Sequence, residues 1–291
     1  MTFPELTSSD MKFPALDQHT KKMTLKGIWH VVISYLFAPY AFVGIFISIL
    51  TAALVVGPFF KKHLFAYLHW WQKLLMEMLF LTCGFELELE GLEHINDDES
   101  YIIACNHRSW VDVFATVFAF KPKLSFVFMV NDYLLKIPFA GRFMLMAGYV
   151  PVSKGRKKKK QKGENKIQQA AEGIQKGVSI LVFPEGTRMP DHRFGVFKRG
   201  VFSIAQSTQT KVVPVVVSGT GTLFPRGTPF ARPGKVRVEI LPPLPAPTDN
   251  DDAAKWLGDL RTQIASRYRL EADSAPLAEN PELLDAALGV D

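Results

Sequence analysis

The feature that most constrains the fold is a run of 34 residues, 27–60, that contains no Asp, Glu, Lys or Arg. About 20 apolar residues are enough for a helix to cross a bilayer, so the run predicts contact with lipid. Lysines stand on both sides of it, and the distribution of cations therefore gives no direction of insertion. Equal flanks favour a helical hairpin with Pro39 and Gly44 near its bend, while a single span and a buried soluble helix pair are the alternatives.

Composition and cysteine usage agree with a protein at the cytosolic face of a membrane. Hydrophobic residues make up 48% of the 291 residues, and 23 of the residues are Phe, which is apolar for a freely soluble chain. The two cysteines, Cys83 and Cys105, lack the CxxC spacing of a metal site or a redox motif, and they predict no disulfide framework. We expect both thiols to be reduced and buried, as is usual on a reducing cytosolic face.

Seven positive charges are concentrated in residues 154–162, KGRKKKKQK. The whole chain has a net charge of +6, so the remainder of the chain carries no excess of positive charge. A protein that binds nucleic acid spreads basic residues over a face and interleaves them with aromatic ones, which this single run does not do. Next to a membrane anchor the run predicts contact with anionic headgroups. A solvated loop without a role is the alternative.

From residue 85 onward, short apolar runs alternate with segments of helical periodicity. This alternation predicts an α/β domain with a central, mostly parallel or mixed sheet flanked by helices. The N-terminal hairpin would precede it, followed by an apolar helix over 64–82. Within the domain the expected strands are 85–91, 101–105, 124–130, 179–184, 211–219 and 235–241, and the expected helices are 110–120, 132–146, 163–176 and 199–208.

Composition also divides the chain into four parts. Residues 1–26 form a polar tail, 27–82 the membrane-anchoring helices, and 83–245 the domain that carries the motifs described below. The proline-rich segment 241–249 predicts an extended linker. Residues 246–291 then supply a C-terminal amphipathic helix, expected over 251–270, and an acidic tail that we expect to be weakly structured.

A histidine and an aspartate stand five positions apart in NHRSWVD, directly after the expected strand 101–105. Ser109 and Asp112 have the S-x-x-D spacing of a helix start, which places Asp112 in the first turn and His107 in the connection before it. On a continuous helix the two side chains would point about 140° apart, whereas a turn lets them meet. Asp112 could then accept the Nδ1 proton and leave Nε2 free for the proton of a substrate hydroxyl. The spacing alone favours the alternative, a capping aspartate near an unrelated histidine.

A second polar cluster, FPEGTR, follows the expected strand 179–184. Gly186 permits close approach of a ligand to the backbone, and Arg188 offers a fork of donors shaped for phosphate. Glu185 could accept hydrogen bonds from a polar group of a substrate. Lys198 opens the next helix, where a cation opposes the helix dipole and favours a nearby anion. A turn with a surface salt bridge is the alternative reading of this cluster.

Four blocks in this order resemble the lysophosphatidic acid acyltransferases, or 1-acyl-sn-glycerol-3-phosphate acyltransferases, within the glycerolipid acyltransferases. An H-x4-D pattern is weak by itself, but its combination with FPEGTR about 75 residues later is specific. The resemblance covers roughly residues 85–245. Its blocks are NHRSWVD at 106–112, GYVPVS at 148–153, FPEGTR at 183–188 with FKRG at 197–200, and VVPVVVSG at 212–219.

The resemblance implies that His107 is a general base that activates a glycerol hydroxyl toward an acyl thioester, with Asp112 orienting it. It implies no covalent acyl-enzyme, in agreement with the lack of a G-x-S-x-G motif. It further implies no cofactor and no metal, only acyl-CoA or acyl carrier protein thioester as co-substrate. The residues implied in binding the glycerol phosphate of the acceptor are Glu185, Gly186, Thr187 and Arg188. Arg188 is implied at the phosphate itself, with Lys198 and Lys154 as weaker candidates.

The second block departs from the pattern of the family. In the family this block often ends in an acidic residue and an arginine, whereas this chain has Ser153 and Lys154 at these positions. A lysine supplies charge but no bidentate fork, so we expect looser binding of the phosphate or a different acceptor. Another lysophospholipid, a lyso-aminolipid and glycerol 3-phosphate are the alternative acceptors.

The resemblance also bears on partners and location. It implies a membrane-bound enzyme whose active site lies at the cytoplasmic face of the inner membrane or an endomembrane, with lysophospholipid and acyl thioester as its partners and no nucleic acid. A catalytically silent lipid-binding protein with the same fold is a remote alternative.

Overall fold

The computed structural model describes most of the chain from residue 63 onward. The polar tail 1–26 and the basic loop 154–162, including Lys154, lie outside the described residues, and so does almost all of the expected hairpin over 27–60. Among the helices of the described part, none combines the length and apolar character needed to cross a membrane. The described residues are 63–120, 124–137, 140–152, 170–190, 193–226, 231–272 and 274–289, with isolated positions between 32 and 59.

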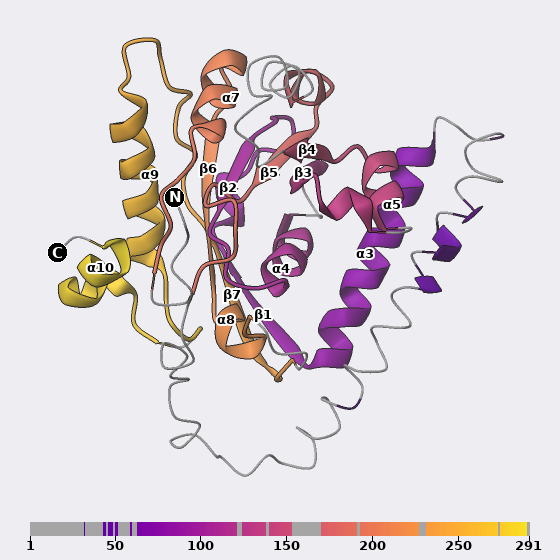
Figure 1. Ribbon diagram of the computed structural model, residues 1–291, viewed down its shortest axis with the longest axis horizontal. Coiled ribbons are helices and arrows are strands. Elements are labelled where there is room, and N and C mark those ends of the chain that lie inside the picture. Colours follow the sequence, from indigo (N-terminus) through magenta and orange to yellow (C-terminus); the bar gives the residue numbers. More distant parts are fainter. Residues whose placement is uncertain are drawn as a thin grey trace, which may run out of the picture.

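A seven-stranded sheet forms the centre of the molecule (Figure 1). In chain order its strands are β1 (Phe85–Glu90), β2 (Ile102–Cys105), β3 (Phe126–Asn131), β4 (Val150–Val152), β5 (Ser179–Val182), β6 (Val212–Ser218) and β7 (Gly234–Ile240). They are arranged β1-β7-β6-β2-β5-β3-β4, and every neighbouring pair is parallel except β6 with β7. The mixed sheet predicted from the sequence is therefore confirmed.

The three central strands are buried along their whole length. Every residue of β2, β5 and β6 is buried. Strands covered on both faces read as nearly continuous apolar runs, which is why IIAC, SILV and VVPVVVS show no alternation. The edge strand β1 is only partly buried, and its sequence FELELE alternates apolar and charged residues. Its Glu88 pairs with a basic residue of β7, with 3.0 Å between Oε1 of Glu88 and Nζ of Lys235.

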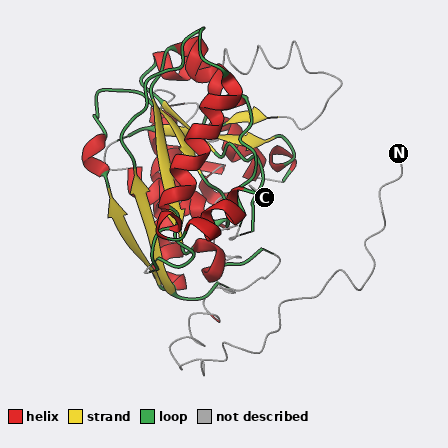
Figure 2. Ribbon diagram, turned by 90° about the vertical axis from the view of Figure 1, so that its left-hand side faces the viewer, coloured by secondary structure: helices red, strands yellow, loops and turns green. Residues whose placement is uncertain are grey.

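Helices cover both faces of the sheet. On one face lie α3 (Leu64–Cys83), α4 (Val111–Phe120) and α5 (Ala140–Met146), and on the other lie α7 (Gly200–Thr208), α9 (Ala253–Arg267) and α10 (Pro281–Leu288) (Figure 1). Figure 2, turned by 90°, shows helices of the second face in front of the strands. The two faces have separate apolar clusters.

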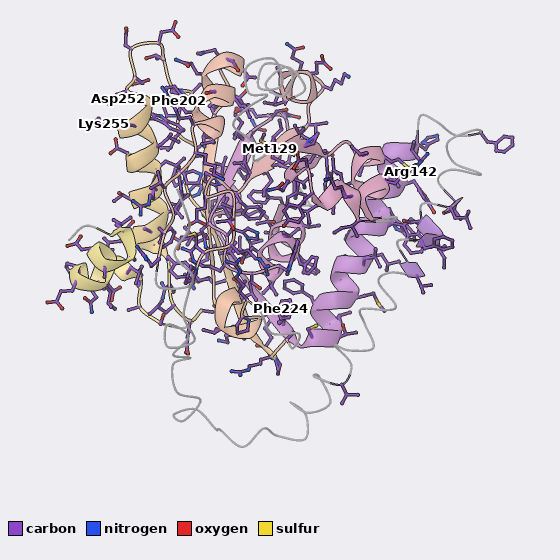
Figure 3. The ribbon with its side chains drawn as sticks, viewed as in Figure 1. Met129, Arg142, Phe202, Phe224, Asp252 and Lys255 are labelled. Atoms are coloured by element: carbon purple, nitrogen blue, oxygen red, sulfur yellow. The ribbon has the colours of Figure 1, made fainter. Side chains whose placement is uncertain are left out.

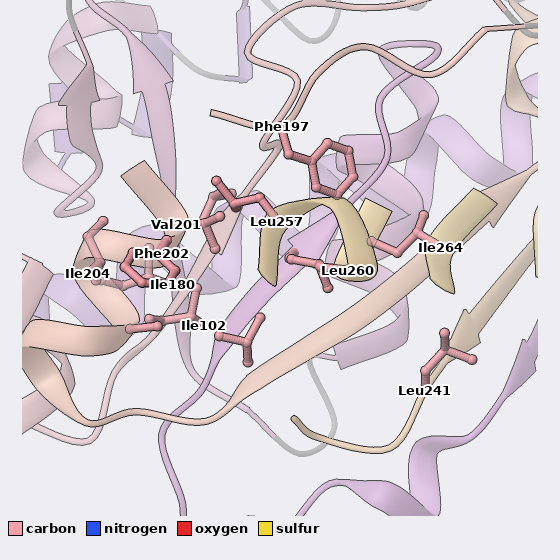
Figure 4. Packing of buried hydrophobic residues seen from close by; sticks show 14 of the residues in the cluster. Ile102, Ile180, Phe197, Val201, Phe202, Ile204, Leu241, Leu257, Leu260 and Ile264 are labelled. Carbon is pink, nitrogen blue, oxygen red and sulfur yellow. The ribbon is translucent and has the colours of Figure 1, made fainter. Parts of the chain in front are cut away.

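The cluster under α9 joins this helix to α7 and the sheet. Figure 4 shows Leu257 of α9 beside Val201 of α7, and both side chains are buried. Figure 3 places Phe202 of α7 near the start of α9, where its ring packs edge-on against Trp256 at 5.7 Å. The expected helix over 251–270 is confirmed as α9, and Asp252 caps it by accepting from the amide of Ala254 at 2.9 Å.

One predicted helix is divided in the structure. In place of a single helix over 132–146, a short 3₁₀ turn at Leu134–Lys136 is followed by α5. Ile137 between them is extended, with ψ 122°. The next residue is Pro138, and a proline disfavours helical backbone in the residue before it. The strand β4 was not predicted at all, since only three residues form it.

The prediction of a weakly structured tail beyond Glu271 is wrong. A 3₁₀ turn at Leu277–Glu279 leads into α10, which Asn280 caps by accepting from the amide of Leu283 at 3.2 Å. Composition did not indicate this helix, because its stability comes from docking. Arg261 of α9 donates to the carbonyl of Leu288 at 2.8 Å.

Candidate active site

The polar turns of the sequence meet at one edge of the sheet. The strands β6, β2 and β5 are neighbours in this order and run parallel, so their carboxyl ends lie together. Ligand sites of α/β proteins form at such strand ends. The turn 106–110 follows β2, the turn 183–189 follows β5, and the short helix α8 (Thr220–Leu223) follows β6.

His107 and Asp112 are in contact, as predicted. The distance from Nδ1 of His107 to Oδ2 of Asp112 is 2.8 Å. The predicted helix start explains the contact: Ser109 Oγ accepts from the amide of Val111 at 3.3 Å, and Asp112 Oδ2 accepts from the amides of Arg108 and Ser109 at 2.6 and 2.8 Å. The turn therefore brings the carboxylate, which is fully buried, back toward the imidazole.

The hydrogen bond to Asp112 determines the tautomer of His107. A carboxylate can only accept, so the proton of the neutral imidazole lies on Nδ1, and Nε2 carries a lone pair. Among the described residues, the imidazole of His107 is hydrogen-bonded through Nδ1 alone, and the side chain is 13% exposed. The ring stacks on Phe183, with 4.1 Å between centroids. The lone pair of Nε2 is thus held in one orientation and is available to a ligand.

Glu185 does not have the position predicted for it. We expected its carboxylate to bind a polar group of a substrate, but the side chain is fully buried. Its Oε2 accepts from the amide of His107 at 2.9 Å, and its Oε1 accepts from the amide of Gly195 at 3.1 Å. Both oxygens also accept from Arg108. Glu185 therefore joins the two motif turns and has no oxygen facing solvent.

The remaining residues of the second cluster lie nearer to solvent. Gly186 has φ +67°, a conformation that favours glycine, and Nζ of Lys198 lies 2.1 Å from where a Cβ would stand. Thr187 is exposed. The guanidinium of Arg188 lies over the ring of Trp110 at 5.0 Å. The turn 183–189 thus carries the positive charge of Arg188, and the ammonium of Lys198 lies beside Gly186 of this turn. Lys154 lies outside the described residues.

Arg108 is a buried residue that motif reasoning did not single out. Its Nη1 donates to the two carboxylate oxygens of Glu185 at 3.0 and 3.2 Å. Burial alone would lower the pKa of Arg108, but the adjacent carboxylate of Glu185 outweighs this, so that the pKa lies above its usual value. The guanidinium also lies over the rings of Phe194, at 4.1 Å, and Tyr268, at 5.1 Å. Aromatic contact takes the place of hydrogen bonds at Nε and Nη2, for which the described residues supply no partner.

Cys105 lies next to the site but is unsuited to be a nucleophile. It is fully buried, and its Sγ donates to the carbonyl of Asn106 at 3.2 Å. Burial, followed by the negative charges of Asp112 and Glu185, raises the pKa of the thiol well above its usual range. The thiol therefore stays protonated, and its burial agrees with the prediction from the sequence.

Comparison with known proteins identifies the family. Residues 86–218 match the family model described as Acyltransferase. A 1-acyl-sn-glycerol-3-phosphate acyltransferase of Saccharomyces cerevisiae is 30% identical over 218 residues, which cover 74% of this chain and 67% of the yeast protein. This chain belongs to the 1-acyl-sn-glycerol-3-phosphate acyltransferase family. The relative from Pseudomonas aeruginosa, which carries the same name, is 27% identical over 250 residues, or 83% of this chain and 93% of that protein.

The share of the relative's own length that this chain matches differs between relatives. A chloroplastic acyltransferase of Arabidopsis thaliana is 33% identical over 162 residues, which are 55% of this chain but only 44% of the plant protein. The matching part of the chain thus spans about half the length of this plant relative. The crystal structure of the 1-acyl-sn-glycerophosphate acyltransferase PlsC of Thermotoga maritima shares the fold, with a TM-score of 0.64 and 24% identity over 82% of this chain and 94% of that one.

Three further residues of the site were not selected from the sequence of this family member. Asn106 pairs its side-chain amide with the carbonyl and the amide of Val217, both at 2.8 Å. Phe183 supports the ring of His107. Thr220 donates to Oδ1 of Asp112 at 2.5 Å. Asn106 and Phe183 belong to the quoted blocks and Thr220 follows the fourth block, so proximity to the motifs was the available signal.

Proposed function

We propose that this acyltransferase moves a fatty acyl group from acyl-CoA or an acyl carrier protein thioester to the free hydroxyl of lysophosphatidic acid and gives phosphatidic acid. The observation that carries the proposal is the oriented pair of His107 and Asp112, with an available Nε2. The positive charges of Arg188 and Lys198 in the adjacent turn add a place for an anion. A base beside an anion site fits an acceptor that carries both a hydroxyl and a phosphate.

In the proposed reaction, Nε2 of His107 takes the proton of the acceptor hydroxyl as its oxygen attacks the carbonyl carbon of the thioester. Asp112 stabilises the imidazolium that forms. The tetrahedral intermediate then collapses, the carbon–sulfur bond breaks, and the leaving thiolate receives the proton from the imidazolium. No group of the protein becomes acylated, which agrees with the burial and the raised pKa of the Cys105 thiol.

We assign the phosphate of the acceptor to the turn after β5. Arg188 is the main ligand, because a guanidinium binds two phosphate oxygens at once. Its stacking on Trp110 keeps the guanidinium beside the turn that carries His107. Lys198 adds charge next to Gly186, and the backbone of Gly186 and Thr187 lies close by. Lys154 would contribute charge without a bidentate fork.

The anchor and the basic loop complete the proposal. Residues 27–60 hold the enzyme in the membrane as a hairpin, and the loop 154–162 binds anionic headgroups. The active site then faces the cytoplasm at the inner membrane or an endomembrane, where both the lipid acceptor and the soluble thioester reach it.

An acceptor-by-donor activity matrix tests this function. The purified protein, in detergent or in a bilayer, should release thiol only when a thioester and an acceptor are both present. We expect the highest rate with lysophosphatidic acid among lysophosphatidic acid, another lysophospholipid, a lyso-aminolipid and glycerol 3-phosphate. A higher rate with one of the other three would replace the acceptor, and no thiol release with any pair would favour the silent lipid-binding protein.

The same matrix tests the phosphate site. Arg188→Ala should raise KM for lysophosphatidic acid by about 10- to 100-fold, since a bond between two charged groups contributes about 1.5–3 kcal/mol. Arg188→Lys, the matched control, keeps the charge and should lose less. The thioester KM should be unaltered in both variants. An equal effect of Arg188→Ala on the KM for the thioester would contradict the assignment.

A further inference from the structure

The two oxygens of the Asp112 carboxylate have different partners. Oδ2 receives three donors from its own turn, namely Nδ1 of His107 and the amides of Arg108 and Ser109. The hydrogen bond to Oδ1 comes from elsewhere in the fold, from the hydroxyl of Thr220 at 2.5 Å. Both side chains are fully buried. Since a carboxylate in this setting only accepts, the proton of this bond belongs to Thr220.

This second contact fixes the rotation of the carboxylate. A carboxylate bonded through one oxygen can still turn about its Cβ–Cγ bond, a broad torsion with a shallow preference. Such a turn would move Oδ2 away from Nδ1 of His107. A donor on the opposite oxygen holds the plane of the group and therefore keeps the imidazole in one orientation.

The turn that carries Thr220 is itself closely fitted. Gly219 before it has φ +83°, and a Cβ at this position would come within 2.7 Å of the carbonyl of Lys235. On either side of Thr220, Asn106 binds the backbone of Val217, and Ser109 Oγ donates to the carbonyl of Phe224 at 2.9 Å. Figure 3 places Phe224 at the end of α8. The turn is thus bonded to the NHRSWVD block before, at and after Thr220.

We infer that Thr220 is a positioning residue for the general base, and that the turn between β6 and α8 sets the geometry of His107 through Asp112. The inference rests on the proposed function but goes beyond it, because the hydroxyl of Thr220 bonds to Asp112 and not to Nε2 of His107 or to a residue of the turn after β5. It also lies outside residues 86–218, the part that matches the family model. The role is one of orientation, so it should alter turnover and leave substrate binding unchanged.

Thr220→Val tests the inference, because valine keeps the shape of threonine and removes the donor. We expect kcat with lysophosphatidic acid and acyl-CoA to fall about 10- to 100-fold, as for the loss of one hydrogen bond to a charged group. Both KM values should stay within about twofold, and Thr220→Ser should restore kcat because it keeps the hydroxyl. Thr208→Val is the matched control: it removes a threonine hydroxyl that binds the carbonyl of Ile204 in α7, away from this turn, and it should leave kcat unchanged.

Several results would overturn the inference. They are a wild-type kcat in Thr220→Val, an equal loss in Thr220→Ser, or a rise of both KM values together with a lower melting temperature. If Thr220→Val does not fold, the pair Thr220→Ser and Thr220→Ala carries the same comparison, since these two variants differ by the hydroxyl alone.

A readout without turnover separates this inference from the proposed function. In ¹H–¹⁵N spectra of the full chain in micelles, the Nδ1 proton of His107 should be visible in the wild type and in Thr220→Ser. In Thr220→Val it should exchange faster with water and broaden. An unchanged signal in Thr220→Val overturns the inference even if the wild type acylates none of the acceptors, whereas an inactive wild type with the expected spectra overturns the proposed function alone.

Discussion

Glutamine in place of His107 is expected to lower kcat by about 10³-fold, because an amide cannot take the proton of the acceptor hydroxyl and general base catalysis contributes about 10²- to 10⁴-fold. The side chain of His107 contacts Asp112 and Phe183 and is not part of the apolar core. The melting temperature and both KM values should therefore remain close to those of the wild type. Initial rates of thiol release, together with thermal unfolding, measure these quantities.

Asp112→Asn is the matched variant for this prediction. It keeps the shape of the side chain but removes the charge that stabilises the imidazolium, and it no longer fixes the tautomer of His107, because a carboxamide donates as well as accepts. The loss of kcat should approach that of His107→Gln, and the double variant should be no slower than the slower single one, since the pair acts as a unit. More than a tenth of the wild-type kcat in His107→Gln would contradict the role of a base.

Arg108→Met is expected to cost about 3–5 kcal/mol of unfolding free energy, because it leaves the carboxylate of Glu185 buried without its partner. Both side chains of this ion pair are fully buried, and the charge of Glu185 also holds the amides of His107 and Gly195. Glu185→Gln should be destabilising for the same reason, since it leaves the guanidinium of Arg108 among the rings of Phe194 and Tyr268. Denaturant unfolding of the protein in detergent measures the change.

The double variant Arg108→Met with Glu185→Leu provides the control for this effect. It removes both charges, so it should be less destabilised than the sum of the two single variants. Lys211→Met, which breaks the exposed ion pair with Glu99, should leave the unfolding free energy nearly unchanged. Equal effects of Arg108→Met and Lys211→Met would contradict the account of a buried pair.

Local patterns were sufficient to predict much of the domain. The apolar runs of β2, β5 and β6 are continuous because these strands are buried on both faces, and their ends located both motif turns. The spacing of Ser109 and Asp112 predicted the start of α4. This start made a contact between Asp112 and His107 possible, and the resemblance to the family favoured it. In these cases the residues that determine the structure are close in the sequence.

Contacts between distant segments were not predictable in this way. Glu185 looked like a ligand for substrate until its partner Arg108, 77 positions away, was placed beside it. Thr220 reaches Asp112 across 108 positions. Docking of α10 depends on Arg261 and on the carbonyl of Ala287, which accepts from the amide of Phe194. None of these partners follows from periodicity or composition, because each depends on how the sheet orders its strands.

The most direct test of the central claim follows the acyl group itself. The wild type is incubated with an acyl thioester labelled in its acyl chain, first alone and then with lysophosphatidic acid, and the label is measured on protein and on lipid. We predict no label on the protein at any time, and labelled phosphatidic acid only after the acceptor is added. A labelled protein that passes its acyl group to the acceptor, or label found only in free fatty acid, would contradict direct transfer by His107.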